Sequence, residues 1–173
     1  MKKIGVRMFN ILKRQKYLKI IRKNLEKKER PLIDAFKNLE TLRFPADARV
    51  LMAISSMDDS EECGVYLAVN EDLFDGVDQV DEDSPYTDGV ILIENFLLYP
   101  MPDDSKAYDA FIDFYVASHL EQHIMKEISC WVKKCFDRAQ ITLPLPIYFS
   151  FTDEDDALNL VTGKWQDQME IEL

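Results

Sequence analysis

The chain has two histidines, and they lie four residues apart in a stretch without Gly or Pro. If this stretch is helical, His119 and His123 stack on one face and Glu127 continues the same row. Two imidazoles and a carboxylate could hold zinc or iron, which makes a metal-dependent enzyme one hypothesis. The metalloprotease motif His-Glu-x-x-His is absent, and Glu121 points away from the histidine face. The alternative interpretation is a pair of histidines at the boundary between core and solvent.

A calcium site could form from dense carboxylates in the predicted acidic loop, Asp78, Asp81, Glu82 and Asp83. An EF-hand frame that starts at Asp81 places Tyr86 where glycine must turn the loop and Leu92 where glutamate must bind. The EF-hand interpretation therefore fails. A looser ion site and a solvated loop are the alternatives that this segment leaves open.

Four consecutive acidic residues at 153–156 follow a predicted strand, as the carboxylates of two-metal nuclease sites often do. Because four neighbouring acids cannot all face one point, the N-terminal cap of a short helix at 157–161 is the simpler interpretation. No two of the five glycines are close enough to form a phosphate-cradling loop. Cys130 precedes Trp131 in a predicted helix, where packing rather than activation is expected. The sequence thus offers no motif for nucleotide or nucleophilic chemistry.

The N-terminal part of the chain has sequence patterns typical of helices. Residues 8–29 lack Gly and Pro and are rich in Lys, Arg, Leu and Ile, which favours a helix. Pro31 is predicted to interrupt this helix or to start the next one. A second amphipathic helix is expected from Leu32 to about Arg43, where Pro45 closes it.

The remaining elements predict an α+β fold in a single domain, with N-terminal helices, a mostly antiparallel sheet of four to five strands, and one long helix packed on it. The long helix is expected from Tyr108 to about Arg138, with its N-terminal cap among residues 103–105. An acidic loop is expected at 70–89. The strand candidates are residues 50–54, 64–69, 90–93 with a possible extension to 98, 147–151, and 169–173.

Charge is distributed unevenly along the chain. Residues 1–30 carry a net charge of +10, whereas residues 31–173 carry −21. Between Val50 and Ser105 there are 15 acidic residues and no basic one. We therefore divide the chain into a basic N-terminal helical segment, 1–30, and an acidic α+β domain, 31–173. An acidic body of this kind repels nucleic acid and attracts basic surfaces, so direct nucleic-acid binding by the body is not expected.

The basic segment has three interpretations. The favoured one is that it folds back onto the acidic body, where opposite charges complement each other. It could also bind anionic lipid, although it lacks Trp and its apolar face is mixed. Contact with nucleic acid, while the body binds something else, is the third.

The leading functional hypothesis is an acidic, non-catalytic protein that neutralises a basic partner protein. In composition alone the chain is similar to immunity proteins, which block a co-encoded nuclease or other toxin, and to the nucleic-acid mimics of phages. Carboxylates would steer the partner, and neighbouring aromatic side chains would anchor it. The residues expected to bind the partner are Asp58, Asp59, Glu61, Glu62, Tyr66, Glu71, Asp72, Phe74, Asp75, Asp78, Asp81, Glu82, Asp83 and Tyr86.

A scaffold or assembly subunit is the other alternative, in which the basic helix of one copy meets the acidic body of the next. No oligomeric state is predicted, and no cofactor is expected. The three cysteines show no metal-ligand spacing, and Cys130 and Cys135 would point apart on a helix, so free thiols are expected. No apolar run is long enough to span a bilayer, and the N-terminal segment lacks the apolar core of a secretory signal. The expected location is therefore the cytoplasm.

Overall fold

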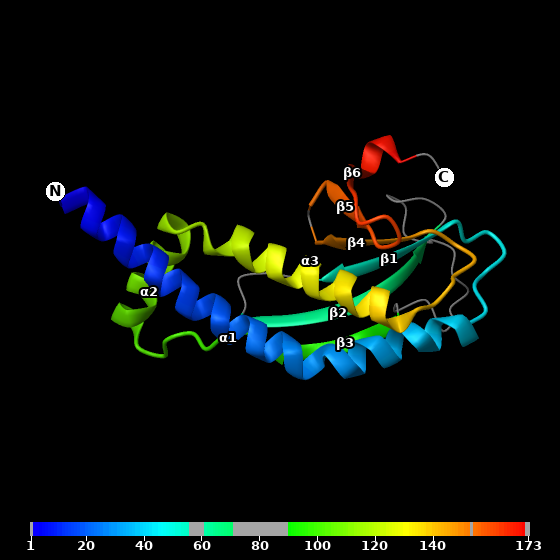
Figure 1. Cartoon of the computed structure of the whole chain (residues 1–173), viewed down its shortest axis with the longest axis horizontal. Helices are drawn as coiled ribbons and strands as arrows, with labels where there is room; N and C mark the ends of the chain where they lie inside the picture. The colour runs from blue at the N-terminus through cyan, green and yellow to red at the C-terminus, as the bar shows by residue number, and fades with distance from the viewer. Residues whose placement is uncertain (1, 56–60, 71–89, 153, 172–173) are drawn as a thin grey trace.

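A computed structural model describes residues 2–55, 61–70, 90–152 and 154–171, with the side chains of the first helix described from Asn10 onward. Over these residues the chain forms an α+β fold with three α-helices and one six-stranded sheet (Figure 1). The helices are α1 (Lys2–Asn38), α2 (Ser105–Ala117) and α3 (Leu120–Ala139). The strands are β1 (Val50–Ser55), β2 (Glu62–Asn70), β3 (Val90–Leu97), β4 (Ile147–Phe151), β5 (Asp156–Asn159) and β6 (Trp165–Asp167). Short 3-10 helices, η1 (Leu39–Thr41) and η2 (Gln168–Glu170), follow α1 and β6.

The strands lie in the order β3-β2-β1-β4-β5-β6. The three strands before α2 and the three strands after α3 therefore form one continuous sheet. Within the described sheet β1 and β4 are parallel, and the other neighbours are antiparallel. Parallel strands need a crossover connection, and the path between β1 and β4 includes α2 and α3. The predicted α+β class with a mostly antiparallel sheet agrees with this arrangement. The described sheet has six strands instead of the expected four to five.

The C-terminal hairpin, β5 and β6, accounts for the difference. The predicted short helix at 157–161 is wrong, because Ala157 and Leu158 lie in β5 and pair with β6. These two buried side chains belong to the apolar clusters on opposite faces of the sheet, as the alternation of a strand requires. The strand predicted at 169–173 is also wrong where the structure describes it, because residues 168–170 form η2.

One face of the sheet is covered by α1 and α3, which pack against each other, with α1 against β3 and α3 against β4 (Figure 1). The main core lies between this helical layer and the sheet. Apolar residues recur in α1 and η1 at seven-residue intervals and supply one row of that core. The row consists of Leu18, Leu25, Leu32 and Leu39, all at most 3% exposed.

A smaller apolar cluster lies on the opposite face of the sheet. Val50 and Met52 of β1 are buried there with Tyr148 and Ala157. Partly buried Ile54, Ala68 and Ile171 pack against them. Both faces of the central strands are therefore apolar, which explains why β1 reads as a continuous apolar run rather than an alternating one.

Helix α1 continues through Pro31, so the predicted interruption is wrong. Proline cannot donate to the carbonyl one turn earlier, but Pro31 lies on the exposed side of the helix, where water can replace the lost donor. Leu32 and Phe36 are fully buried on the inward side and bind the second half of α1 to the core. The boundary that we drew at residue 30 falls inside this helix, and residues on both sides of it belong to one core.

The predicted single helix from 108 to 138 is wrong, because Ser118 and His119 separate α2 from α3. His119 adopts a left-handed backbone conformation, with φ of 52°, which ends the helical path. The predicted cap at the start is confirmed, since the Asp104 side chain accepts a hydrogen bond from the Ala107 N–H. The break lets α2 place Phe111 and Phe114 against the ring of Tyr17 in α1.

Ion pairs connect α1 to α3 at two levels. Arg22 donates two hydrogen bonds to the Glu127 carboxylate, of 2.8 and 2.5 Å. About two turns further along α1, Glu29 pairs with Lys134 and Arg138. Hydrogen bonding to Lys134 is the main cause that lowers the pKa of Glu29, and burial acts in the opposite direction. Among the described residues, no helix is long and apolar enough to cross a membrane.

Replacing Leu25 by Ala should lower the free energy of unfolding by about 2–5 kcal/mol, because the substitution leaves a cavity between α1, α3 and the sheet. The matched control is Lys23→Ala, an exposed change in the same helix that should cost no more than about 0.5 kcal/mol. Urea denaturation of both variants measures the difference. Equal stabilities would contradict the docking of α1.

Replacing Glu29 by Gln should destabilise the protein at neutral pH but have little effect in acid. The folded-state pKa of Glu29 is depressed, so its stabilising contribution is present above the pKa of the unfolded chain, about 4.3. That contribution is lost as the pH falls through the lower pKa of the folded state. Urea unfolding from pH 7 to pH 3 should show the stabilities of the wild type and Glu29→Gln converging. The matched control at pH 7 is Glu26→Gln, an exposed change in the same helix that removes no described ion pair and should cost no more than about 0.5 kcal/mol.

Candidate functional site

The structure does not assemble the predicted metal ligands into one cluster. His119 is exposed at the break before α3, outside the regular helical row that its proposed role requires. His123 lies within α3, and burial is the first cause that lowers its pKa, followed by the charges of Arg14 and Lys126. Glu127 is engaged by Arg22. Over the described part of the chain, no group of three His, Cys, Asp or Glu residues could hold a metal ion.

Most of the predicted partner-binding residues lie outside the described residues. Three can be placed. Glu61 precedes β2 and Glu62 is its first residue, beside the end of β3, where the Leu98 N–H donates to the Glu61 carbonyl. Tyr66 is half-buried further along β2 and is paired with Ile54 of β1. The residues outside are Asp58, Asp59, Glu71, Asp72, Phe74, Asp75, Asp78, Asp81, Glu82, Asp83 and Tyr86.

Opposite charges are segregated over the described fold. Residues 10–38 of α1 carry ten Lys and Arg against three acids, and α3 carries four basic residues against three acids. The described segments outside the α-helices carry twelve acids against three basic residues. One group of these acids lies on the C-terminal hairpin and the residues beside it. These hairpin acids are Glu154, Asp155, Asp156, Asp167 and Glu170, all exposed.

A groove of about 570 Å³ separates α3 from the C-terminal hairpin. This α3–hairpin groove is within the range of volumes that ligand sites occupy. Its α3 wall uses residues three and four positions apart, which form one face of the helix. The lining residues are Gln122, Met125, Lys126, Ser129, Cys130 and Lys133 on α3, and Phe151, Glu154, Asp156, Leu158, Gly163 and Trp165 on the hairpin side.

The two walls of the groove differ in charge. On the hairpin side, Glu154 and Asp156 are exposed, and neither has an ion-pair partner among the described residues. On the helix side, Lys133 is paired with Asp137, with distances of 2.5 and 2.6 Å from its Nζ to the two carboxylate oxygens. Lys126 on the same wall is exposed and has no ion-pair partner among the described residues. The groove therefore favours a ligand whose charge is positive on the hairpin side.

Trp165 supplies the large apolar surface of this groove. Its side chain is 49% exposed, and it shares the lining with Met125, Phe151 and Leu158. Tryptophan is enriched among residues that dominate binding energy at protein interfaces. An aromatic ring beside free carboxylates also suits a cationic side chain, which the ring face and the acids attract together.

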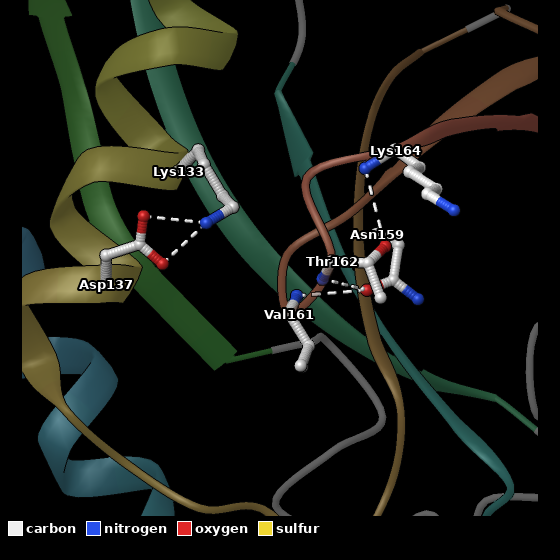
Figure 2. A network of polar contacts seen from close by, with 6 residues as sticks. All are labelled: Lys133, Asp137, Asn159, Val161, Thr162 and Lys164. Atoms are coloured by element: carbon white, nitrogen blue, oxygen red, sulfur yellow. Dashed lines mark hydrogen bonds and ion pairs between the residues drawn. The ribbon is translucent and has the colours of Figure 1, made fainter.

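The turn between β5 and β6 lies on the hairpin wall, opposite α3. The Asn159 side chain accepts hydrogen bonds from the Val161 and Thr162 N–H groups, of 3.0 and 2.8 Å. Figure 2 shows this turn facing the Lys133–Asp137 ion pair of α3. Gly163 completes the turn with φ of +71°, a conformation that favours glycine. The turn thus has a defined conformation on the hairpin wall of the groove, which Gly163 lines.

This groove was not predicted from the sequence. The acids at 153–156 were assigned to a helix cap, and Trp165 was given no role. One local signal was present, because Asn159 and Gly163 stand between apolar Leu158 and aromatic Trp165, a pattern typical of a hairpin turn. Nothing local indicates that this hairpin would face α3, since that contact depends on the position of β5 in the sheet.

Replacing Gly163 by Ala should lower the free energy of unfolding by about 1–2 kcal/mol, because the φ of +71° is strained for an L-residue with a side chain. The new Cβ would also lie 3.3 Å from Lys133 Cε, but that flexible chain end can move. Gly163→Asn is the matched control, since Asn tolerates this conformation better. Thermal unfolding should rank the Asn variant above the Ala variant; equal losses would assign the cost to the Lys133 contact.

Comparison with known proteins provides no relative from which a role could be transferred. No family model matches the chain, and no curated protein or solved structure matches it. The functional argument therefore depends on the geometry and charge of the chain itself.

Proposed function

We propose that this chain is a non-catalytic binding protein that captures and neutralises a basic partner protein, as an immunity protein or inhibitor does with a nuclease toxin or nucleic-acid-binding protein. The observation that carries the proposal is the α3–hairpin groove, where an apolar floor and a half-exposed tryptophan lie beside unpaired carboxylates. Such a surface combines steering by charge with burial of an anchor, which are the two requirements of a tight complex.

The charge distribution supports the same proposal. The described ion pairs of α1 use Arg22, Glu29, Arg30 and Asp34 and involve none of the hairpin acids. The described ion pairs of the basic helix therefore leave the hairpin acids unpaired. A coherent field of one sign raises association rates by about 10–1000-fold at low ionic strength.

A reducing compartment such as the cytoplasm is part of the proposal. The three cysteines are free, with Cys63 and Cys135 buried and Cys130 exposed. Burial is the main cause that raises the pKa of Cys63 to about 11 and that of Cys135 to about 12. Both buried thiols therefore stay protonated and unreactive at neutral pH.

Neutralising four hairpin acids should slow association with a basic probe by about tenfold at low salt. The variant carries Glu154→Gln, Asp155→Asn, Asp156→Asn and Glu170→Gln. The probe is a fluorescein-labelled twelve-residue peptide of alternating lysine and threonine, and stopped-flow anisotropy gives the association rate. The wild-type rate should fall steeply between 20 and 200 mM salt, and that of the variant should fall less.

The matched control removes the same number of charges from the helices, through Glu26→Gln, Asp109→Asn, Asp113→Asn and Glu121→Gln, all at exposed positions. This control should slow association clearly less than the hairpin variant does. Equal effects would show that net charge alone matters and would remove the hairpin from the proposal. A wild-type chain that does not bind the basic probe at low salt would overturn the proposed function.

A further inference from the structure

The outer edge of β6 is open in the described fold. β6 is the last strand of the sheet, and no described strand pairs with its far side. On the near side, the Asn159 N–H donates to the Lys164 carbonyl and the Gln168 N–H donates to the Asp155 carbonyl, both at 2.9 Å. Since hydrogen-bond direction alternates along an antiparallel strand, the backbone groups of Trp165 and Asp167 point away from β5. An open edge of this kind is a template for another strand.

The same two residues place their side chains on the groove side of the hairpin. Trp165 lies opposite Leu158, and Asp167 lies opposite Asp156. Leu158, Asp156 and Trp165 all line the α3–hairpin groove. The open backbone groups and the acidic, aromatic side chains are therefore presented to one and the same ligand.

The pairing of Asp156 with Asp167 is unfavourable in isolation. Like charges directly opposite each other on neighbouring strands destabilise a sheet, and both residues are exposed without a described cation beside them. A cationic side chain placed between them would remove this repulsion. The charge at the edge thus favours a basic strand.

A second copy of this chain is a poor occupant of the same edge. Pairing β6 with β6 of another molecule would bring two sets of hairpin acids together, and their repulsion would oppose the contact. Charge complementarity selects a partner of the opposite sign.

We propose, resting on the proposed function, that an extended basic segment of the partner adds to the sheet as an antiparallel strand beside β6. Its backbone exchanges hydrogen bonds with Trp165 and Asp167. Its alternate residues, lysine or arginine, face the groove side between Asp156 and Asp167 and over the Trp165 ring. This is strand addition, in which main-chain bonds supply affinity and alternate side chains supply specificity.

Replacing Asp167 by Pro tests the backbone contact. Asp167 has φ of −61°, which proline adopts without strain, and its N–H points away from β5. Because the substitution also removes the carboxylate and the cap on the Met169 N–H, the matched control is Asp167→Ala, which loses both but keeps the donor. The dissociation constant for the lysine–threonine peptide should be about threefold to tenfold weaker for Asp167→Pro than for Asp167→Ala, the effect of one lost hydrogen bond.

A modified probe tests the same contact from the partner's side. In an antiparallel pair, the lysines that place their side chains on the groove side are also the residues whose N–H groups face β6. Methylation of every lysine backbone nitrogen removes these donors and keeps all the charges. The methylated peptide should bind the wild-type chain at least tenfold more weakly than the unmodified peptide, with a similar salt dependence. Bound unmodified peptide should also slow hydrogen exchange at the Trp165 and Asp167 amides.

The outcomes separate this inference from the proposed function. If binding depends on salt but is weakened by neither Asp167→Pro nor backbone methylation, strand addition is overturned and the proposed function as an acidic binding protein stands. Absence of salt-dependent binding to either peptide would overturn both. Sedimentation at low salt provides a further check, since a dimer of the free chain that is lost in Asp167→Pro would assign the edge to a second copy and overturn the inference.

Discussion

The burial of one apolar face of α1 against α3 and the sheet is the contact on which the rest of the architecture depends. The row of leucines that recurs every seven residues continues past Pro31. Burial of each leucine stabilises the fold by about 1.5–3 kcal/mol relative to an exposed side chain. This row fixes the position of α1, and α3 packs against α1. The opposite face of the groove from the C-terminal hairpin is formed by α3. The ion pairs of Arg22 and Glu29 add orientation at the surface of an interface that apolar contacts form.

The same packing explains how a chain of strongly opposed charges folds without cancelling them. The inward face of α1 is apolar, so the helix docks by that face and keeps most of its lysines outward. The described ion pairs that α1 makes with another element are all with α3, whose basic and acidic residues are nearly equal in number. The acids of the C-terminal hairpin lie at the far edge of the sheet, beyond β4. The proposed capture of a basic partner depends on this separation.

Local patterns predicted the parts of the fold that local forces determine. Periodicity indicated the helical N-terminal region and the strands at 50–54, 64–69, 90–93 and 147–151, and Asp104 forms the cap that its residue type suggests. Two boundaries were wrong because tertiary contacts override local preference. Buried Leu32 and Phe36 carry α1 through Pro31, and the left-handed His119 divides a stretch that has no Gly or Pro. The groove could not be predicted, because Trp165 and Met125 come to line one groove through the strand order, which no local pattern encodes.

Cys130 borders the groove, and it is the exposed member of three free thiols. A maleimide dye added to the folded wild-type chain should therefore attach at one position, next to the proposed docking surface and away from the sheet core. Engineered labelling sites are then unnecessary. The natural chain already carries an attachment point from which a fluorophore or spin label can report occupancy of the groove.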